Sequence, residues 1–268
     1  MTGSRILGDC LLESLVPAFH TPDASLLCIP GSGHGGWAWR FWLPLFAQAG
    51  YGGHALSFPN HGEAPSMEME RYCALTIDDY VARVVQIAAV LPKPLVLIGH
   101  SLGGMVAQLA AQRIESAALV LVASSGPRQL GLRRGELFPA DQPVVFAPDV
   151  VGPRWFTDAA PEIMAWALAR LAPESPGVLN GSGGRAEVDP SLIRCPVLVV
   201  EAGRDASSIP SQAELAALYG GDLLLFPEAG HDIMLERTAL RAARGVLGWL
   251  DRNLPIQSRH PHAGYPIT

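Results

Sequence analysis

Positive charge is scarce in this sequence, and lysine is almost absent. Only 16% of the 268 residues are charged, the formal net charge is -6, and Lys93 is the single lysine, so arginine supplies the other positive charges. A nucleic-acid partner requires a clustered basic face that neutralises phosphates. Because the sequence offers no such cluster, we expect no nucleic acid among its partners.

Cysteine is rare as well. The four cysteines show no paired spacing of the metal-binding kind; they are Cys10, Cys28, Cys73 and Cys195. Cys28 and Cys195 lie in or beside apolar, strand-like runs, which favours buried reduced thiols over disulfides.

Long apolar runs are missing too. No stretch is long and apolar enough to span a bilayer. The N-terminal segment includes Asp9 and Glu13 and lacks the pattern of a signal peptide. We therefore expect a soluble cytoplasmic protein without a membrane span, and its oligomeric state stays open.

What is present is an alternation of short apolar runs with amphipathic segments. This pattern predicts the α/β class, with a mostly parallel sheet and helices on both faces. Strands are expected at 25–30, 53–58, 95–99, 117–123, 196–202 and 222–226, after an edge hairpin within 11–19. Helices are expected at 37–49, 77–91, 161–171, 211–219 and 234–253, and directly after Ser101. Residues 1–123 and 191–254 would form the core, 124–190 an inserted cap and 255–268 a loosely held tail.

The most informative stretch surrounds Ser101. An apolar run ends at Gly99 and an Ala-rich helical segment follows the serine, which gives the pattern Gly99-His100-Ser101-Leu102-Gly103. The two glycines let the strand and helix backbones approach closely at a sharp turn, so the serine stands exposed at the corner. This context predicts that Ser101 is a catalytic nucleophile.

A serine nucleophile needs a base that removes its proton and an acid that holds the base in the right tautomer. Both are present in the chain order typical of such turns, each after a predicted strand. Asp205 follows the strand at 196–202, and His231 follows the strand at 222–226. We predict Asp205 as the acid and His231 as the base.

Other acids and histidines are weaker candidates. Glu201 and Asp232 are rival acids, but Glu201 lies within an apolar run and Asp232 is expected to cap the helix that follows it. Of the remaining histidines, only His34 is kept, as a residue of the substrate pocket.

The glycine-rich turn at 31–36 follows the first strong strand and predicts the second half of an oxyanion hole. One donor would be the amide of Leu102, directly after the nucleophile. The other would be the amide of Ser32, which Gly31 and Gly33 make accessible.

The same turn also fits the dinucleotide-binding fingerprint, because Gly31, Gly33 and Gly36 have the required spacing. That fingerprint also needs an acidic residue at the end of the next strand. Residues 57–60 read Ser-Phe-Pro-Asn, and the first acid is Glu63. A dinucleotide-binding oxidoreductase is therefore a disfavoured alternative.

The segment at 124–190 is rich in proline and glycine and carries apolar residues that could roof a pocket, among them Trp155 and Trp166. Ligands in such sheets bind beyond the carboxyl ends of the strands, which favours this place for a pocket. The alternative is that these residues only pack the cap onto the core.

With these residues placed, the chain resembles the α/β-hydrolase superfamily over about residues 25–253. The run Gly-Ser-Gly-His-Gly-Gly-Trp-Ala-Trp at 31–39 resembles the turn of small carboxylesterases of the plant methylesterase and hydroxynitrile-lyase type and their bacterial esterase relatives. Residues 162–172 are similar to their cap helix. Two features depart from the family: Pro30 replaces its usual histidine, and the loop before Asp205 is one residue shorter.

The resemblance implies hydrolysis of a carboxylic ester of a small, moderately apolar substrate through an acyl-enzyme, without a metal or organic cofactor. Two alternatives on the same fold are a cyanohydrin lyase and a small-molecule receptor. Such lyases place a lysine beside the catalytic histidine, where this chain has Asp232. A receptor would turn over slowly or only once.

Overall fold

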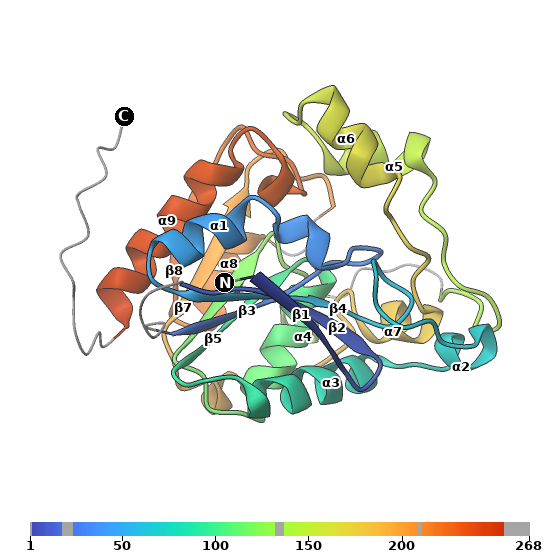
Figure 1. Ribbon diagram of the computed structural model, residues 1–268, viewed down its shortest axis with the longest axis horizontal. Coiled ribbons are helices and arrows are strands. Elements are labelled where there is room, and N and C mark those ends of the chain that lie inside the picture. The colour runs from blue at the N-terminus through green and yellow to red at the C-terminus, as the bar shows by residue number, and fades with distance from the viewer. Residues whose placement is uncertain (1, 18–23, 132–136, 208–210, 255–268) are drawn as a thin grey trace.

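The computed structural model describes residues 2–17, 24–131, 137–207 and 211–254. Within these residues the chain forms an eight-stranded sheet with the order β1-β2-β4-β3-β5-β6-β7-β8 (Figure 1). β1 and β2 form an antiparallel hairpin, β2 is antiparallel to β4, and all other neighbours are parallel. The predicted mostly parallel sheet is confirmed.

The strands are β1 (Thr2–Leu7), β2 (Cys10–Leu15), β3 (Ser25–Ile29), β4 (Gly52–Ser57), β5 (Leu95–His100), β6 (Ala118–Val122), β7 (Val197–Ala202) and β8 (Asp222–Phe226). The α-helices are α1 (Trp42–Gln48), α2 (Met69–Cys73), α3 (Ile77–Val90), α4 (Leu102–Ala111), α5 (Pro148–Trp155), α6 (Pro161–Leu168), α7 (Pro176–Gly181), α8 (Gln212–Leu218) and α9 (Ala239–Asn253). Short 3-10 helices are η1 (Gly36–Trp39), η2 (Arg128–Leu130), η3 (Pro190–Leu192) and η4 (Ile233–Leu235).

Helices cover both faces of the sheet, and the two faces have separate cores. Because strand side chains alternate between faces, Val96 and Ile98 of β5 pack with α1 and α9, whereas Leu95 and Leu97 pack with α3, α4 and α8. Figure 1 shows α1 and α9 on one side of the sheet and α3 and α4 on the other. Burial of these apolar side chains is the main favourable term that holds the layers together.

Several predicted boundaries differ from the structure. The N-terminal hairpin occupies 2–15 instead of lying within 11–19, whose last residues fall outside the described part of the chain. The helix expected at 37–49 is divided into η1 and α1. The final helix starts at Ala239 instead of residue 234, because the residues after Asp232 first form η4 and Glu236 then adopts an extended backbone.

The residues between β6 and β7, called the β6–β7 segment below (123–196), contain more helix than predicted. α6 was expected, but α5 and α7 were not, since Pro153 lies inside α5 and Gly177 inside α7, where proline and glycine disfavour helix. In Figure 1, α5 and α6 lie beyond the sheet edge, apart from α7. This segment therefore has two helical parts, α5 with α6 and α7 alone, that lie at different places in the molecule.

The four cysteines are free, as expected. No helix among the residues described is long and apolar enough to cross a bilayer. The tail predicted at 255–268 lies outside the described residues.

The sheet topology determines where the functional residues meet. β3, β5, β6, β7 and β8 are parallel, so their carboxyl ends lie along one edge of the sheet. Chain segments that leave these strands at the same edge can combine into one site.

Candidate active site

Ser101 occupies a strained corner between β5 and α4. Its backbone has φ 51° and ψ -119°, a left-handed φ that costs a non-glycine residue about 1–3 kcal/mol. The corner is held by two backbone hydrogen bonds: the Ser101 N–H donates to the Val122 carbonyl at 3.1 Å, and the Ser125 N–H donates to the Ser101 carbonyl at 3.1 Å. The strained serine that the sequence predicted is therefore fixed by β6 and the residues after it.

Gly99 and Gly103 are required by the close approach of backbones at this corner. A Cβ on Gly99 would lie 2.4 Å from the carbonyl oxygen of Gly103, and one on Gly103 would lie 2.3 Å from the carbonyl oxygen of Pro30. Real Cβ atoms do not come this close to backbone oxygens. The reason predicted for the two glycines is thus seen directly in the geometry.

His231 and Asp205 form a buried pair. Nδ1 of His231 lies 2.7 Å from Oδ2 of Asp205, and their side chains are 4% and 1% exposed. Burial lowers the pKa of His231, but the hydrogen bond and charge of Asp205, with the charge of Asp232, outweigh burial and raise it. The rival Glu201 lies in β7 and makes no hydrogen bond to His231. The structure therefore brings together the two residues that the order of strands predicted.

His100, the residue before Ser101, contacts the loop that carries His231. Its Nε2 donates to the carbonyl oxygen of His231 at 3.0 Å, and the two rings lie 4.7 Å apart. Burial and the neighbouring His231 lower the pKa of His100 to about 3, so this ring is neutral and donates through Nε2, while Nδ1 carries no proton. Among the described residues the Ser101 hydroxyl has no hydrogen bond to His231. In free enzymes such a bond is often long and tightens on substrate binding.

Two amides near Ser101 have no hydrogen-bond acceptor among the described residues. Leu102 is the first residue of α4, so its N–H has no acceptor within the helix. The Ser32 N–H has no acceptor among the residues that the structure describes. Gly31 packs against the corner, since a Cβ there would lie 3.1 Å from Cβ of Ser101. These are the two donors expected for an oxyanion hole.

The predicted pocket residues differ in position. His34 is buried, and both of its ring nitrogens face protein acceptors, Oδ2 of Asp232 at 3.1 Å and the Ser32 carbonyl at 2.8 Å. Trp155 lies between this ring and the base, with ring centroids 5.5 Å from His34 and 6.1 Å from His231. Trp166 lies further out, 5.4 Å from Trp37. Of the two predicted tryptophans, Trp155 is therefore the one beside His231.

A family model described as "Alpha/beta hydrolase family" matches residues 26–244. The chain belongs to the alpha/beta hydrolase family. This confirms the resemblance predicted from the sequence. A search of curated protein sequences found no significant match.

Solved structures of several enzymes resemble this hydrolase. An Arabidopsis methylesterase has a TM-score of 0.68 at 16% identity, covering 85% of this chain and 98% of its own. A thermophilic esterase has 0.67 at 18%, covering 94% and 98%. A thioesterase domain from the curacin biosynthetic pathway has 0.66 at 18%, covering 94% and 99%. At such identities the likeness shows the fold alone.

Asp232 does not cap a helix, contrary to the prediction. Its side chain makes no capping hydrogen bond to η4 and instead contacts His34, while its N–H donates to the Trp155 carbonyl at 2.9 Å. A buried carboxylate needs polar partners, and Asp232 finds the His34 ring, 3.1 Å away, instead of the amides of a single 3-10 turn. Sequence reasoning missed this pair because the two residues are 198 positions apart.

Glu174 of the β6–β7 segment is a second residue that the sequence did not indicate. It is 1% exposed, and its carboxylate receives hydrogen bonds from the Gly33 amide and from Tyr72 and Tyr80. His61 lies 3.3 Å away and completes a buried ion pair. The only local signal was an acidic residue in a proline-flanked stretch.

The glycine-rich turn does not offer a pyrophosphate site. The Gly33 amide donates to Glu174, the His34 amide to the Gly31 carbonyl and the Gly36 amide to Oγ of Ser57. The helix that follows is the short η1, so the extended helix N-terminus of a dinucleotide fold is missing from the described residues here. This geometry, with the family, argues against the dinucleotide alternative.

One buried cluster has side chains that could bind a metal ion. Ligand atoms of His100, His231 and Asp232 lie within 4.8 Å of one another. These groups already have protein partners: the carbonyl of His231 for His100, Asp205 for His231 and His34 for Asp232. The hydrogen bonds of the hydrolase site account for this cluster, and we assign no metal to it.

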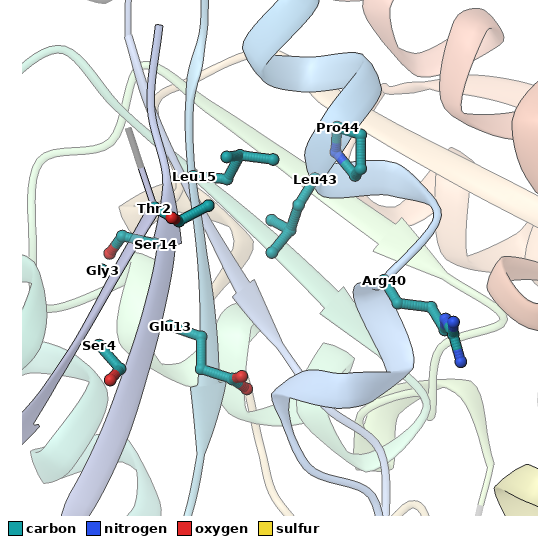
Figure 2. Close-up of a pocket in the computed structure, with 9 residues that line it drawn as sticks. All are labelled: Thr2, Gly3, Ser4, Glu13, Ser14, Leu15, Arg40, Leu43 and Pro44. Atoms are coloured by element: carbon teal, nitrogen blue, oxygen red, sulfur yellow. The ribbon is translucent and has the colours of Figure 1, made fainter. Parts of the chain in front are cut away.

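A hollow of about 440 Å³ opens beside the N-terminal hairpin, where Figure 2 shows Glu13 of β2 and Arg40 after η1 among its lining residues. Ser14, also in the lining, has its hydroxyl 2.8 Å from Nδ1 of His54. Ser14 and His54 lie opposite each other in β2 and β4, where backbone amides form the hydrogen bonds of the sheet. Burial, together with the charge of Arg5, lowers the pKa of His54 to about 4. This serine lacks both oxyanion donors and an effective base.

Proposed function

We propose that this hydrolase cleaves a carboxylic ester of a small, moderately apolar substrate through an acyl-enzyme formed on Ser101. The observation that carries the proposal is the strained serine at the β5–α4 corner, connected by His100 to a buried Asp205–His231 pair. A structural serine has no need for a left-handed backbone, which costs stability and is typical of functional sites.

In the first step His231 removes the proton of Ser101 as the hydroxyl oxygen attacks the ester carbonyl carbon. The negative charge on the former carbonyl oxygen is stabilised by the amides of Ser32 and Leu102. His231 then gives its proton to the departing alcohol, and the acyl group stays on Ser101. Asp205 accepts from Nδ1 throughout, which directs Nε2 toward the reaction.

In the second step water attacks the acyl-enzyme. His231 removes a proton from the water, the same two amides stabilise the second oxyanion, and the Ser101 oxygen leaves and regains a proton from His231. The products are a carboxylic acid and a free serine. No step requires a metal or an organic cofactor.

The β6–β7 segment supplies the side chains that would select the substrate. Trp155 at the end of α5 lies close to His231, and the Phe146 ring packs against Trp155 at a tilt, with ring centroids 5.2 Å apart. His34 and Trp37 continue this aromatic wall toward Trp166. We propose that this segment acts as a cap and that the wall contacts an apolar part of the ester.

The test is hydrolysis of p-nitrophenyl esters of graded acyl length, with covalent labelling by an organophosphonate read by mass spectrometry. Ser101→Ala should abolish both, while Ser14→Ala, which removes another hydroxyl that is hydrogen-bonded to a histidine, should leave both unchanged. Full activity in Ser101→Ala would overturn the proposal. A single burst without turnover would indicate a receptor, and cyanohydrin cleavage without ester hydrolysis a lyase.

A further inference from the structure

The peptide group that joins Ser32 to Gly33 is held at both polar ends by buried side chains. Its carbonyl oxygen, on Ser32, accepts from Nδ1 of His34 at 2.8 Å. Its N–H, on Gly33, donates to Oε2 of Glu174 at 3.1 Å. The two side chains come from different parts of the fold, the turn itself and the β6–β7 segment.

The contact on the carbonyl side is supported by a buried carboxylate. Nε2 of His34 lies 3.1 Å from Oδ2 of Asp232, and the two side chains are 1% and 0% exposed. The Ser32 carbonyl and the Asp232 carboxylate are both acceptors, so each ring nitrogen of His34 faces an acceptor. The Ser32 carbonyl is therefore contacted by a ring that the buried Asp232 carboxylate holds at its far nitrogen.

The contact on the amide side is supported in a similar way. Oε2 of Glu174 lies 3.3 Å from Nε2 of His61, and Oε1 accepts from Tyr80 at 2.7 Å and Tyr72 at 3.2 Å. The backbone is tied as well, since the Ala172 N–H donates to the Gly33 carbonyl at 2.9 Å. Glu174 is thus fixed in place before it meets the turn.

The turn needs such restraint because the glycine at position 33 imposes little preference on its own backbone dihedral angles. Its φ is +71°, and glycine adopts positive and negative φ with similar ease. The Ser32–Gly33 peptide could turn over as a unit by opposite changes of ψ at Ser32 and φ at Gly33. That rotation would move the polar groups around Ser32, whose own N–H is one of the two proposed oxyanion donors.

We propose that Glu174 and His34 are positioning residues that fix the Ser32–Gly33 peptide, so that its carbonyl cannot turn toward the oxyanion and the adjacent Ser32 N–H stays available to it. Asp232 and His61 act one step further out, by holding the two clamping side chains. This inference rests on the proposed function, because an oxyanion forms only if Ser101 attacks a carbonyl group. The aimed amide would act on the transition state more than on the bound ester.

The first test compares three variants with a p-nitrophenyl ester. Glu174→Met has a similar length but no acceptor, so kcat should fall about 10²-fold to 10³-fold, the loss typical of one oxyanion donor, while KM changes little. Glu174→Gln keeps one acceptor for Gly33 and should recover most of kcat. Tyr51→Phe, the matched control, removes a tyrosine hydroxyl that donates to Asp251 at 2.8 Å outside the clamp, and it should lower Tm without lowering kcat.

The second test acts on the other end of the same peptide and does not depend on Glu174→Met folding. His34→Phe keeps a ring but removes both donors, and it should lower kcat to a similar extent. Because both variants release one peptide, the double variant should lose less than the product of the two single losses. If the loss of kcat in the double variant equals the product of the two single losses, the two substitutions act independently and the clamp is wrong.

Phosphonate labelling of Ser101 separates the two proposals. If the wild-type protein is not labelled at Ser101, the proposed function and the clamp are both wrong. If the wild type is labelled and Glu174→Met and His34→Phe are labelled at the same rate, only the clamp is wrong. A loss of kcat in Tyr51→Phe equal to that in Glu174→Met would also overturn the clamp, because it would indicate a general effect of stability.

Discussion

Two carboxylate–histidine pairs meet on the loop after β8, because His231 and Asp232 are neighbours in the sequence. In the first pair Asp205 holds only Nδ1 of His231, and Nε2 has no bond to a described residue. In the second pair His34 has both ring nitrogens engaged, one by Asp232 and one by the Ser32 carbonyl. Both pairs are almost fully buried.

The difference between them shows that residue type does not decide the role of a histidine. An imidazole with one open nitrogen can accept and return a proton, whereas one with two occupied nitrogens can only hold its neighbours in place. On the proposals made above, the hydrolase would use the same chemical pair twice, once for reaction and once for position.

If the two histidines differ in this way, the largest difference in kcat is expected between the matched substitutions of Asp205 and Asp232. Asp205→Asn should lower kcat by about 10³-fold to 10⁴-fold, because the amide favours the wrong tautomer of His231. Asp232→Asn keeps an acceptor for His34, and its kcat should fall less than about tenfold. Steady-state kinetics with one p-nitrophenyl ester checks both. Equal losses would mean that the two pairs share one role.

The ion pair of His61 and Glu174, which supports the Ser32–Gly33 turn, should affect stability more than activity. His61→Leu leaves the Glu174 carboxylate buried without its cation, which should cost about 3–5 kcal/mol in the free energy of unfolding. Urea denaturation measures this loss. A change below about 1 kcal/mol would show that the tyrosines alone stabilise the carboxylate.

The same pair predicts a pH dependence of stability. Although burial opposes both charges, their attraction raises the pKa of His61 and lowers that of Glu174. The stabilisation by His61 is complete below its unfolded pKa of about 6.5 and is lost as pH rises through the raised value. The wild type should therefore lose unfolding free energy above pH 6.5 more steeply than His61→Leu. Parallel curves would contradict the ion pair.

The first pair predicts the acid limb of the activity profile. Burial lowers the pKa of His231, but Asp205 and Asp232 raise it overall, and the base must be neutral. Therefore kcat/KM should fall about tenfold per pH unit below a midpoint above 6.5. Asp205→Asn should move that midpoint down. A midpoint that stays in place would assign the limb to another group.

The smallest effect is expected far from both pairs, at Gly248 in the middle of α9. A Cβ there would meet only Nη1 of Arg252, at 3.6 Å, which is an ordinary contact. Gly248→Ala should raise the free energy of unfolding by about 0.5–1 kcal/mol and leave kcat unchanged. A loss of stability would show that α9 does not tolerate a side chain at this position.

Much of the first pair could be predicted from the sequence because its signals are local. Gly99 and Gly103 encode the sharp corner, and Asp205 and His231 each follow a recognisable strand. Parallel strands bring such residues to one edge without further information. Their catalytic roles remain the proposal made above.

The contacts of Asp232 with His34 and of Glu174 with Gly33 could not be predicted, because they join distant parts of the chain. His34 and Asp232 are 198 residues apart, and Gly33 and Glu174 are 141 apart. Neither acid stands in a repeating pattern, so a local rule assigned Asp232 to a helix cap and gave Glu174 no role. Only tertiary packing decides which donors surround a buried carboxylate.

The single lysine gives the molecule one defined side-chain point for chemical attachment. Lys93 is exposed just before β5, whereas Ser101 follows the same strand, so about 20 Å of strand separates them across the sheet. An amine-reactive support or dye bound to Lys93 would therefore lie at the sheet edge opposite the serine. The protein can be immobilised through this residue with its proposed active site facing the solution.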